Sequence, residues 1–202
     1  MKKILIPAVA AISLFSMAFT FSANPLPIGS DLPKADLKLK DVSGKEITLK
    51  SSAKQNGLLV MFSCNTCPYV IKNQARTIET GNYANNMKIG FVVLNSNEAQ
   101  RASDDSYDEM KSYAKSQNYK WDYVVDNNNE VADAFGATRT PECFLFDRNM
   151  KLVYHGAIDD NPSDPGAVTR NHLQIAIKEM VGGKDISVKE SRSVGCSIKR
   201  KS

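Results

Sequence analysis

Two cysteines that directly follow an apolar run constrain this chain of 202 residues more than any other feature. Residues 57–62 are apolar, Cys64 and Cys67 follow with two residues between them, and helical spacing begins at Cys67. We expect a buried strand over residues 58–62, a turn that carries both thiols, and a helix over residues 67–80. Because the N–H groups at a helix start favour a thiolate over a thiol, this arrangement predicts a reactive cysteine pair. The apolar face of the helix is expected to consist of Cys67, Val70, Ile71, Ala75 and Ile78.

The first residues have the layout of a secretory signal peptide. Lys2 and Lys3 precede an apolar stretch from Ile4 to Phe21, and small residues follow. An uncleaved membrane anchor is the alternative, since a stretch of about 18 residues could nearly span a bilayer. We favour a signal peptide over residues 1–22 and a single domain over residues 23–202. The protein is then expected to be periplasmic or extracellular, without a membrane contact after cleavage.

Charge indicates no nucleic-acid partner. Removal of residues 1–22 takes away two lysines and no acids, which lowers the formal net charge from +4 to +2. The remaining excess is concentrated at residues 199–201, at the end of a polar C-terminal tail over residues 184–202. Such a short run is typical of a solvated tail.

The rest of the chain alternates between strand and helix patterns. Ser106 and Glu109 have the spacing of a helix-capping box. Strands are expected at 35–39, 47–49, 88–94, 123–125, 143–146 and 151–154, and helices after Ser106, at 131–135 closed by Gly136, and at 173–181. This order predicts an α/β fold, a mixed central sheet flanked by helices, with an N-terminal β-hairpin extension.

Three motifs resemble the thioredoxin-like superfamily, specifically its exported branch related to the alkyl hydroperoxide reductase and thiol-specific antioxidant proteins. They are residues 28–33 with 41–45, the Cys64–Cys67 turn, and residues 140–147. The likeness spans about residues 25–183. It implies a thioredoxin-like fold in which Pro141 is cis and faces the cysteine pair, and in which Thr140 and Pro141 line a peptide-binding groove.

The implied activity is that of a thiol–disulfide oxidoreductase that needs no cofactor. Cys64 would attack as the nucleophile and Cys67 would resolve the mixed disulfide. Its partners would be protein thiols or disulfides and a second protein that donates or accepts electrons.

The chain departs from the thioredoxin pattern in three places. Ser63 stands where many thioredoxins have an aromatic residue, and Pro68 removes an early N–H group of the helix. Residues 57–62 also contain no buried acid, so proton transfer would depend on water, on Glu142 or on another group.

Two alternative functions use the same fold. A thiol peroxidase needs the pattern P-x-x-x-[TS]-x-x-C, but the required positions before Cys67 are occupied by Val60 and Cys64. A non-catalytic copper-binding module could combine the pair with His155 or His172, because thiolate and imidazole suit copper. Related copper chaperones space their cysteines as C-x-x-x-C, so we predict no metal.

Two further cysteines have different expected roles. Cys143 lies in an apolar strand and is expected to be a buried small residue. Cys196 lies in the polar tail, where a core role is unfavourable. Three fates stay open for Cys196: a bond to Cys143, exchange with the Cys64–Cys67 pair, or an intermolecular disulfide. We favour a role near the active site.

Overall fold

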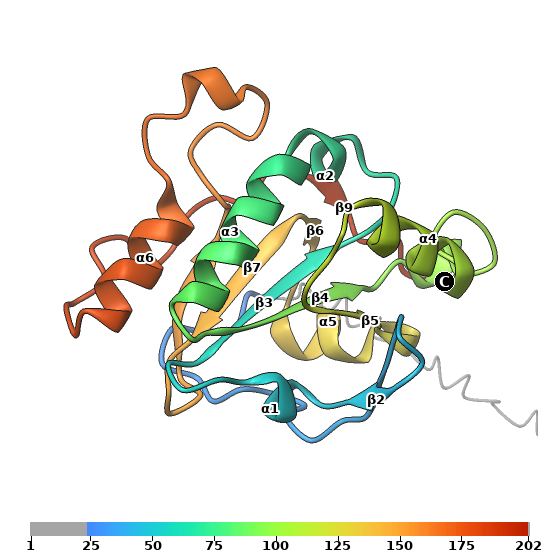
Figure 1. Cartoon of the computed structure of the whole chain (residues 1–202), viewed down its shortest axis with the longest axis horizontal. Coiled ribbons are helices and arrows are strands. Elements are labelled where there is room, and N and C mark those ends of the chain that lie inside the picture. The colour runs from blue at the N-terminus through green and yellow to red at the C-terminus, as the bar shows by residue number, and fades with distance from the viewer. Residues whose placement is uncertain (1–23, 202) are drawn as a thin grey trace, which may run out of the picture.

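A seven-stranded mixed sheet is the centre of the computed structural model, which describes residues 24–201 (Figure 1). The expected signal peptide therefore lies outside the described residues. The strand order is β2-β1-β5-β4-β3-β7-β8. The strands are β1 (Leu39–Asp41), β2 (Glu46–Ile47), β3 (Leu58–Ser63), β4 (Gly90–Asn95), β5 (Asp122–Val125), β7 (Glu142–Phe146) and β8 (Leu152–Gly156). Strands β3, β4 and β5 are parallel, while β7, β8 and β1 pair antiparallel, which confirms the mixed sheet.

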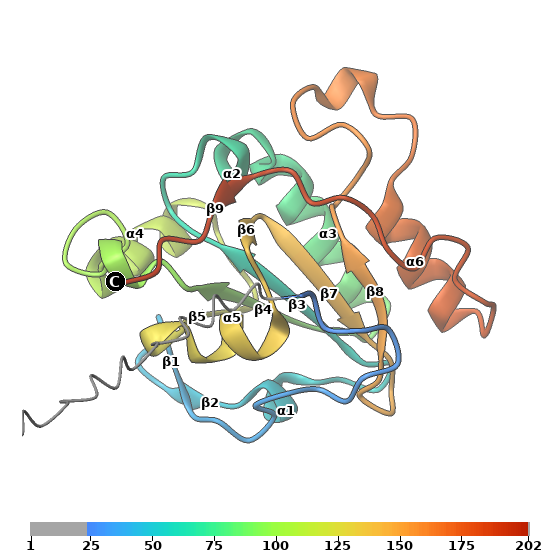
Figure 2. The ribbon, with the colours of Figure 1, turned by 180° about the vertical axis from the view of Figure 1, so that it is seen from behind.

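Helices cover both faces of this sheet (Figures 1 and 2). They are α1 (Leu49–Ser52), α2 (Pro68–Lys72), α3 (Gln74–Asn86), α4 (Tyr107–Ser116), α5 (Glu130–Phe135) and α6 (His172–Val181), with short 3₁₀ turns at Glu98–Gln100, Asn127–Asn129 and Pro165–Ala167. The helices expected at residues 131–135 and 173–181 are confirmed as α5 and α6. α5 ends at Gly136, which has the left-handed conformation. Ser106 caps α4 by accepting from the Glu109 N–H group.

Strand β3 sits between β4 and β7, and each of its residues is buried. Its alternate side chains enter two different cores. Leu59 and Met61 pack in the core that includes residues of α3, α4 and α6, whereas Leu58, Val60 and Phe62 pack in the core that includes residues of α1 and α5. A strand buried on both faces needs a continuous apolar sequence, which residues 58–62 supply.

The expected helix over residues 67–80 is broken at Asn73. The Asn73 side chain donates to the carbonyl groups of Tyr69 and Pro162, and this residue ends α2 and begins α3. Side-chain bonds of this kind compete with the helical backbone ladder. The break changes the helical phase, so the expected apolar face was wrong: Ile71 and Ala75 are exposed, and the buried face of α3 is instead formed by Thr77, Thr80, Gly81 and Ala84.

The N-terminal hairpin exists, but its first strand begins later than expected: of residues 35–39 only Leu39 belongs to β1, because the Leu37 N–H group donates to the Lys34 carbonyl in a turn. The hairpin pairs β1 with β2, and Thr48 then begins the short helix α1 with a capping box to Ser51. Residues expected to continue the second strand are therefore helical, because the Thr48 side chain satisfies the Ser51 N–H group.

The C-terminal tail is docked on the body of the protein, which differs from the expected solvated tail. Its strand β9 (Cys196–Ser197) pairs antiparallel with β6 (Arg139–Thr140) in a separate two-stranded sheet. Ile198 is buried in the core, and the Arg200 guanidinium pairs with Asp133. Backbone pairing and the buried side chains of Ile186 and Ile198 thus hold a segment of polar composition.

Among residues 24–201, no helix combines the length and the apolar character needed to cross a membrane.

Gly57, just before β3, provides a test of the sheet packing. Its φ is +127°, and a Cβ placed there would lie 2.1 Å from the Phe146 carbonyl oxygen. We expect Gly57→Ala to lower the free energy of unfolding by at least about 2 kcal/mol, because backbone strain adds to a steric clash.

Urea unfolding of Gly57→Ala beside Gly44→Ala measures this effect. Gly44 also has positive φ, but a Cβ placed there would meet no atom within 4 Å, so its substitution should cost only about 1 kcal/mol. Equal losses in the two variants would contradict the close approach at Gly57.

Candidate active site

The two cysteines lie where the central strand leaves the sheet. β3 ends at Ser63, and Cys67 is the N-terminal cap residue of α2, with Pro68 at the first helical position. Proline is accommodated there because the N–H groups of the first turn have no partner within the helix. Both thiols are free, yet Cys64 is only 1% and Cys67 only 5% exposed.

The second wall of the site is the cis Thr140–Pro141 peptide between β6 and β7. The Cys64 Sγ lies 3.7 Å from the Thr140 Oγ1, and the Cys67 Sγ lies 3.3 Å from the Thr140 carbonyl oxygen. The expected cis bond is confirmed. The structure therefore brings together Cys64, Cys67 and Thr140, with Pro141 next in the chain.

The two sulfurs differ strongly in acidity. A hydrogen bond from Cys64 is the largest factor that lowers the pKa of Cys67 to about 4, and hydrogen bonds from Cys196 and the Val70 N–H group assist. The hydrogen bond to Cys67, then burial, then the negative charge of Asp105 raise the pKa of Cys64. The pair thus shares one proton that lies on Cys64 while Cys67 carries the charge. Cys64 as nucleophile stays a prediction, and it requires that proton to move to Cys67.

A buried acid lies behind the cysteine turn, although β3 contains none. Asp105 is fully buried, and its Oδ1 accepts from the Asn65 N–H group at 2.8 Å and from the Asn95 Nδ2 at 2.7 Å. Its Oδ2 accepts from the Asn97 Nδ2 at 2.8 Å. The carboxylate therefore fixes the backbone between the two cysteines. Sequence reasoning missed it because Asp105 lies some forty positions further along the chain, in a loop with other polar residues.

Glu142, a candidate for proton transfer, has a different set of contacts. Its Oε2 accepts from the backbone N–H groups of Thr138 and Arg139 at 2.8 Å each, and its Oε1 lies 2.7 Å from the His155 Nε2. Glu142 and His155 are both buried. Glu142 thus orients the chain that leads to the cis-proline.

These contacts also bear on the copper alternative. Within residues 24–201, no group of three or more histidine, cysteine or acidic side chains is arranged to hold a metal ion. The His155 ring is bonded to Glu142 and stacks on Phe144.

Cys143 and Cys196 have separate environments. Cys143 is completely buried in β7, as expected, and burial raises the pKa of its thiol. Cys196 is partly exposed and packs against the group formed by Cys64, Cys67 and Val70. Of the three fates open for Cys196, this position fits exchange with the pair.

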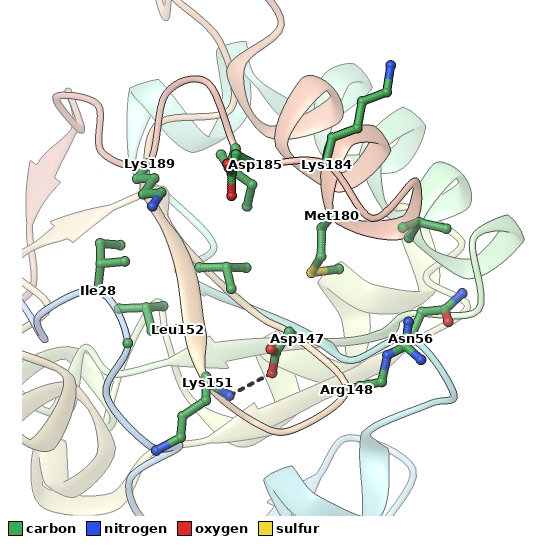
Figure 3. A pocket seen from close by; sticks show the side chains of 14 residues that line it. Ile28, Asn56, Asp147, Arg148, Lys151, Leu152, Met180, Lys184, Asp185 and Lys189 are labelled. Carbon is green, nitrogen blue, oxygen red and sulfur yellow. Dashed lines mark hydrogen bonds between the residues drawn. The ribbon is translucent and has the colours of Figure 1, made fainter.

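A hollow of about 370 Å³ lies at the opposite end of β3 and β7 from the cysteines. Figure 3 shows its charged rim, with Asp147, Arg148 and Lys151 on the β7–β8 turn, Lys184 just after α6, and Lys189 beside β8. None of the four cysteines lines it. The hollow is thus separate from the thiol chemistry.

A C-x-x-C turn that follows a central strand and faces a cis-proline defines a thioredoxin-like thiol redox protein. Residues 27–170 match the Redoxin family model, and the chain belongs to the Redoxin family. No curated protein matches the chain.

Several solved structures are similar. A conserved uncharacterized protein of Geobacillus kaustophilus is 33% identical, with a TM-score of 0.81 over 88% of this chain and 94% of that one. A hypothetical protein of Sinorhizobium meliloti is 31% identical, with a TM-score of 0.78 over 89% and 97% of the two chains. The thioredoxin domain of a Bacteroides vulgatus thiol-disulfide oxidoreductase is 19% identical, with a TM-score of 0.52 over 64% and 88%, and shares the fold.

The acidity of Cys67 predicts a pH-dependent property of the reduced protein. The ultraviolet absorbance of thiolate should rise with a midpoint near pH 4, far below the ordinary thiol value of about 8.5. The unfolded chain keeps this proton up to its ordinary pKa, so the reduced protein should also gain stability as pH rises from about 4 to about 8.5.

The acid step should disappear in Cys67→Ser and persist in Cys143→Ser. If thiolate absorbance first appeared near the ordinary thiol pKa of about 8.5, the low pKa of Cys67 would be contradicted.

Asp105 provides a second test. We expect Asp105→Asn to lower the free energy of unfolding by about 1–3 kcal/mol, since an amide N–H₂ group would face donors that now meet a carboxylate. Loss of the negative charge should also lower the pKa of Cys64. Thermal unfolding, and thiolate titration in a Cys67→Ser background, measure the two effects. The exposed neighbour Asp104 supplies the control Asp104→Asn, and equal effects of both substitutions would exclude the proposed contacts.

Proposed function

We propose that this protein is an exported thiol–disulfide oxidoreductase that acts on protein disulfides through Cys64 and Cys67. One observation carries the proposal: two free thiols of opposed acidity both contact Thr140 beside cis-Pro141. Cys67, which ionises near pH 4, is a thiolate at neutral pH and can take the proton of Cys64, which leaves Cys64 in the thiolate form that exchanges with disulfides.

The reaction proceeds by two exchanges. The shared proton moves from Cys64 to Cys67, and the Cys64 thiolate attacks one sulfur of the substrate disulfide, which releases the other as a thiolate. Cys67 then loses its proton and attacks the Cys64 Sγ, which forms the Cys64–Cys67 disulfide and releases the second substrate thiol. The substrate gains two electrons and the enzyme loses two. Reversal of the same steps oxidises a substrate dithiol.

A protein is the substrate class that suits the surroundings of the pair. β6 pairs with the extended segment β9 beside the cysteine pair, which is the geometry by which a peptide adds a strand to a sheet edge. Ile71, on the helix that begins at the pair, is 57% exposed and offers apolar contact area. A second protein would return the pair to its starting redox state.

Export supports the same reaction. Residues 1–22 have the layout of a signal peptide, and disulfides form and persist outside the cytoplasm. A periplasmic or extracellular place would supply the protein disulfides that the site requires.

Insulin reduction with dithiothreitol as electron source tests this function. Cys64→Ser and Cys67→Ser should each lower turnover at least about 100-fold, because each removes one of the two exchanging sulfurs. Cys143→Ser should leave turnover unchanged, since this thiol is buried away from the exchange. Hydrogen peroxide consumption by the wild type that exceeds its disulfide turnover would overturn the proposal in favour of a thiol peroxidase.

A further inference from the structure

The C-terminal strand occupies the edge at which a protein substrate would pair. β9 pairs antiparallel with β6, and Cys196 is opposite Thr140, the residue that contacts both Cys64 and Cys67. Figures 1 and 2 show this segment beside β6 and α2 from opposite sides. A substrate strand cannot use the same edge while β9 lies there.

The tail sequence is adapted to this close approach. A Cβ at Gly195 would lie 2.1 Å from the Thr140 carbonyl oxygen and 3.3 Å from the Pro141 nitrogen. Glycine therefore permits the contact that any other residue would prevent. This close approach of Gly195 to Thr140 indicates that the tail is specifically docked.

Contacts on both sides of Cys196 hold the tail in place. Downstream, the Ile198 N–H donates to the Thr138 carbonyl, and the Lys199 N–H donates to the Asn97 Oδ1 at 2.9 Å. Upstream, the Ser191 N–H donates to the His155 carbonyl, and the Ser191 Oγ accepts from the Ala157 N–H at 2.9 Å. The Cys196 backbone is thus positioned relative to the cysteine pair.

We propose that Cys196 is a third redox-active cysteine, which exchanges with the pair through a Cys67–Cys196 disulfide and relays electrons between the buried pair and an external thiol. This inference rests on the proposed function. Cys196 packs against the pair, and it is partly exposed whereas Cys64 and Cys67 are buried. Cys196 is opposite Thr140 in the β6–β9 pairing, and the carbonyl oxygen of Thr140 lies 3.3 Å from the Cys67 Sγ.

The relay needs no additional oxidant. The Cys196 thiolate attacks the Cys67 Sγ of the Cys64–Cys67 disulfide, so the Cys67–Cys196 bond forms and the Cys64–Cys67 bond breaks. Cys64 leaves as a thiolate and takes up the proton that Cys196 gave up, with no net change in electrons. A thiolate of a reducing partner then attacks the Cys196 Sγ, Cys67 leaves as a thiolate, and a second partner thiol resolves the mixed disulfide at Cys196. The pair is then reduced and the partner oxidised.

Disulfide mapping of Cys64→Ser tests the relay. The reduced variant is treated with oxidised glutathione, blocked with N-ethylmaleimide and digested with trypsin without reduction. We expect a cross-link between the peptides of residues 55–72 and 193–199, formed when Cys196 attacks glutathionylated Cys67 and releases glutathione. Cys143→Ser in the same background should give an equal yield. Glutathionylated Cys67 without the cross-link would overturn the proposal.

Two substitutions in and beside β9 test whether the Cys67–Cys196 cross-link depends on the docked position of Cys196 or only on the reactivity of its thiol. In the Cys64→Ser background, Gly195→Ala should slow cross-linking at least roughly tenfold, since displacement of about 1 Å strongly slows a positioned reaction. Ser197→Ala alters an exposed side chain of the same segment and should leave the rate unchanged. Equal rates in all three proteins would contradict a relay that depends on the docked strand.

Wild-type turnover of insulin, measured in parallel, distinguishes the two proposals. Turnover without the cross-link would reject the relay alone, and the cross-link without turnover would reject the proposed function while Cys67–Cys196 exchange stood. If Cys64→Ser does not fold, the wild type in glutathione buffers gives the same readout. Its Cys64–Cys67 disulfide stays within one tryptic peptide, whereas Cys67–Cys196 joins two.

Discussion

Thr140 contacts every part of the site through different atoms. Its hydroxyl lies beside the Cys64 sulfur, its carbonyl oxygen lies beside the Cys67 sulfur, and its position in β6 is opposite Cys196. The cis bond to Pro141 follows it, and Glu142 fixes the preceding backbone by accepting from the Thr138 and Arg139 N–H groups. The geometry of three cysteines therefore depends on how the chain enters β7.

The sheet supplies the rigidity for this arrangement. β3 and β7 are adjacent, with Phe62 opposite Glu142 at the end where the cysteines lie. Phe62 packs edge-to-face on Phe135 and Phe144. Behind the turn, Asp105 binds the Asn65 N–H group, and the Tyr123 hydroxyl donates to the Asn65 Oδ1. The cysteine turn is thus held by a packed core on one side and a buried polar network on the other.

The sequence predicted the parts of the fold that have strong local patterns. The apolar run before Cys64 indicated β3, and the motif around Thr140–Pro141 indicated the opposite wall through family resemblance. It could not predict Asp105, because proximity of that residue to the cysteines arises only when β4 and β3 pair in parallel. It likewise missed the break at Asn73 and the docking of the tail. Both depend on contacts with distant residues, such as Pro162 for Asn73 and Thr140 for Gly195.

The central claim is that Cys64 and Cys67 form a reversible redox pair, and a redox titration of the wild type tests it most directly. Protein equilibrated in glutathione buffers is alkylated, and mass spectrometry counts the blocked thiols. The account predicts that two thiols disappear together in a two-electron transition, at a potential between about −270 and −120 mV as in other thioredoxin-like pairs. Persistence of both Cys64 and Cys67 as thiols throughout that range would contradict it.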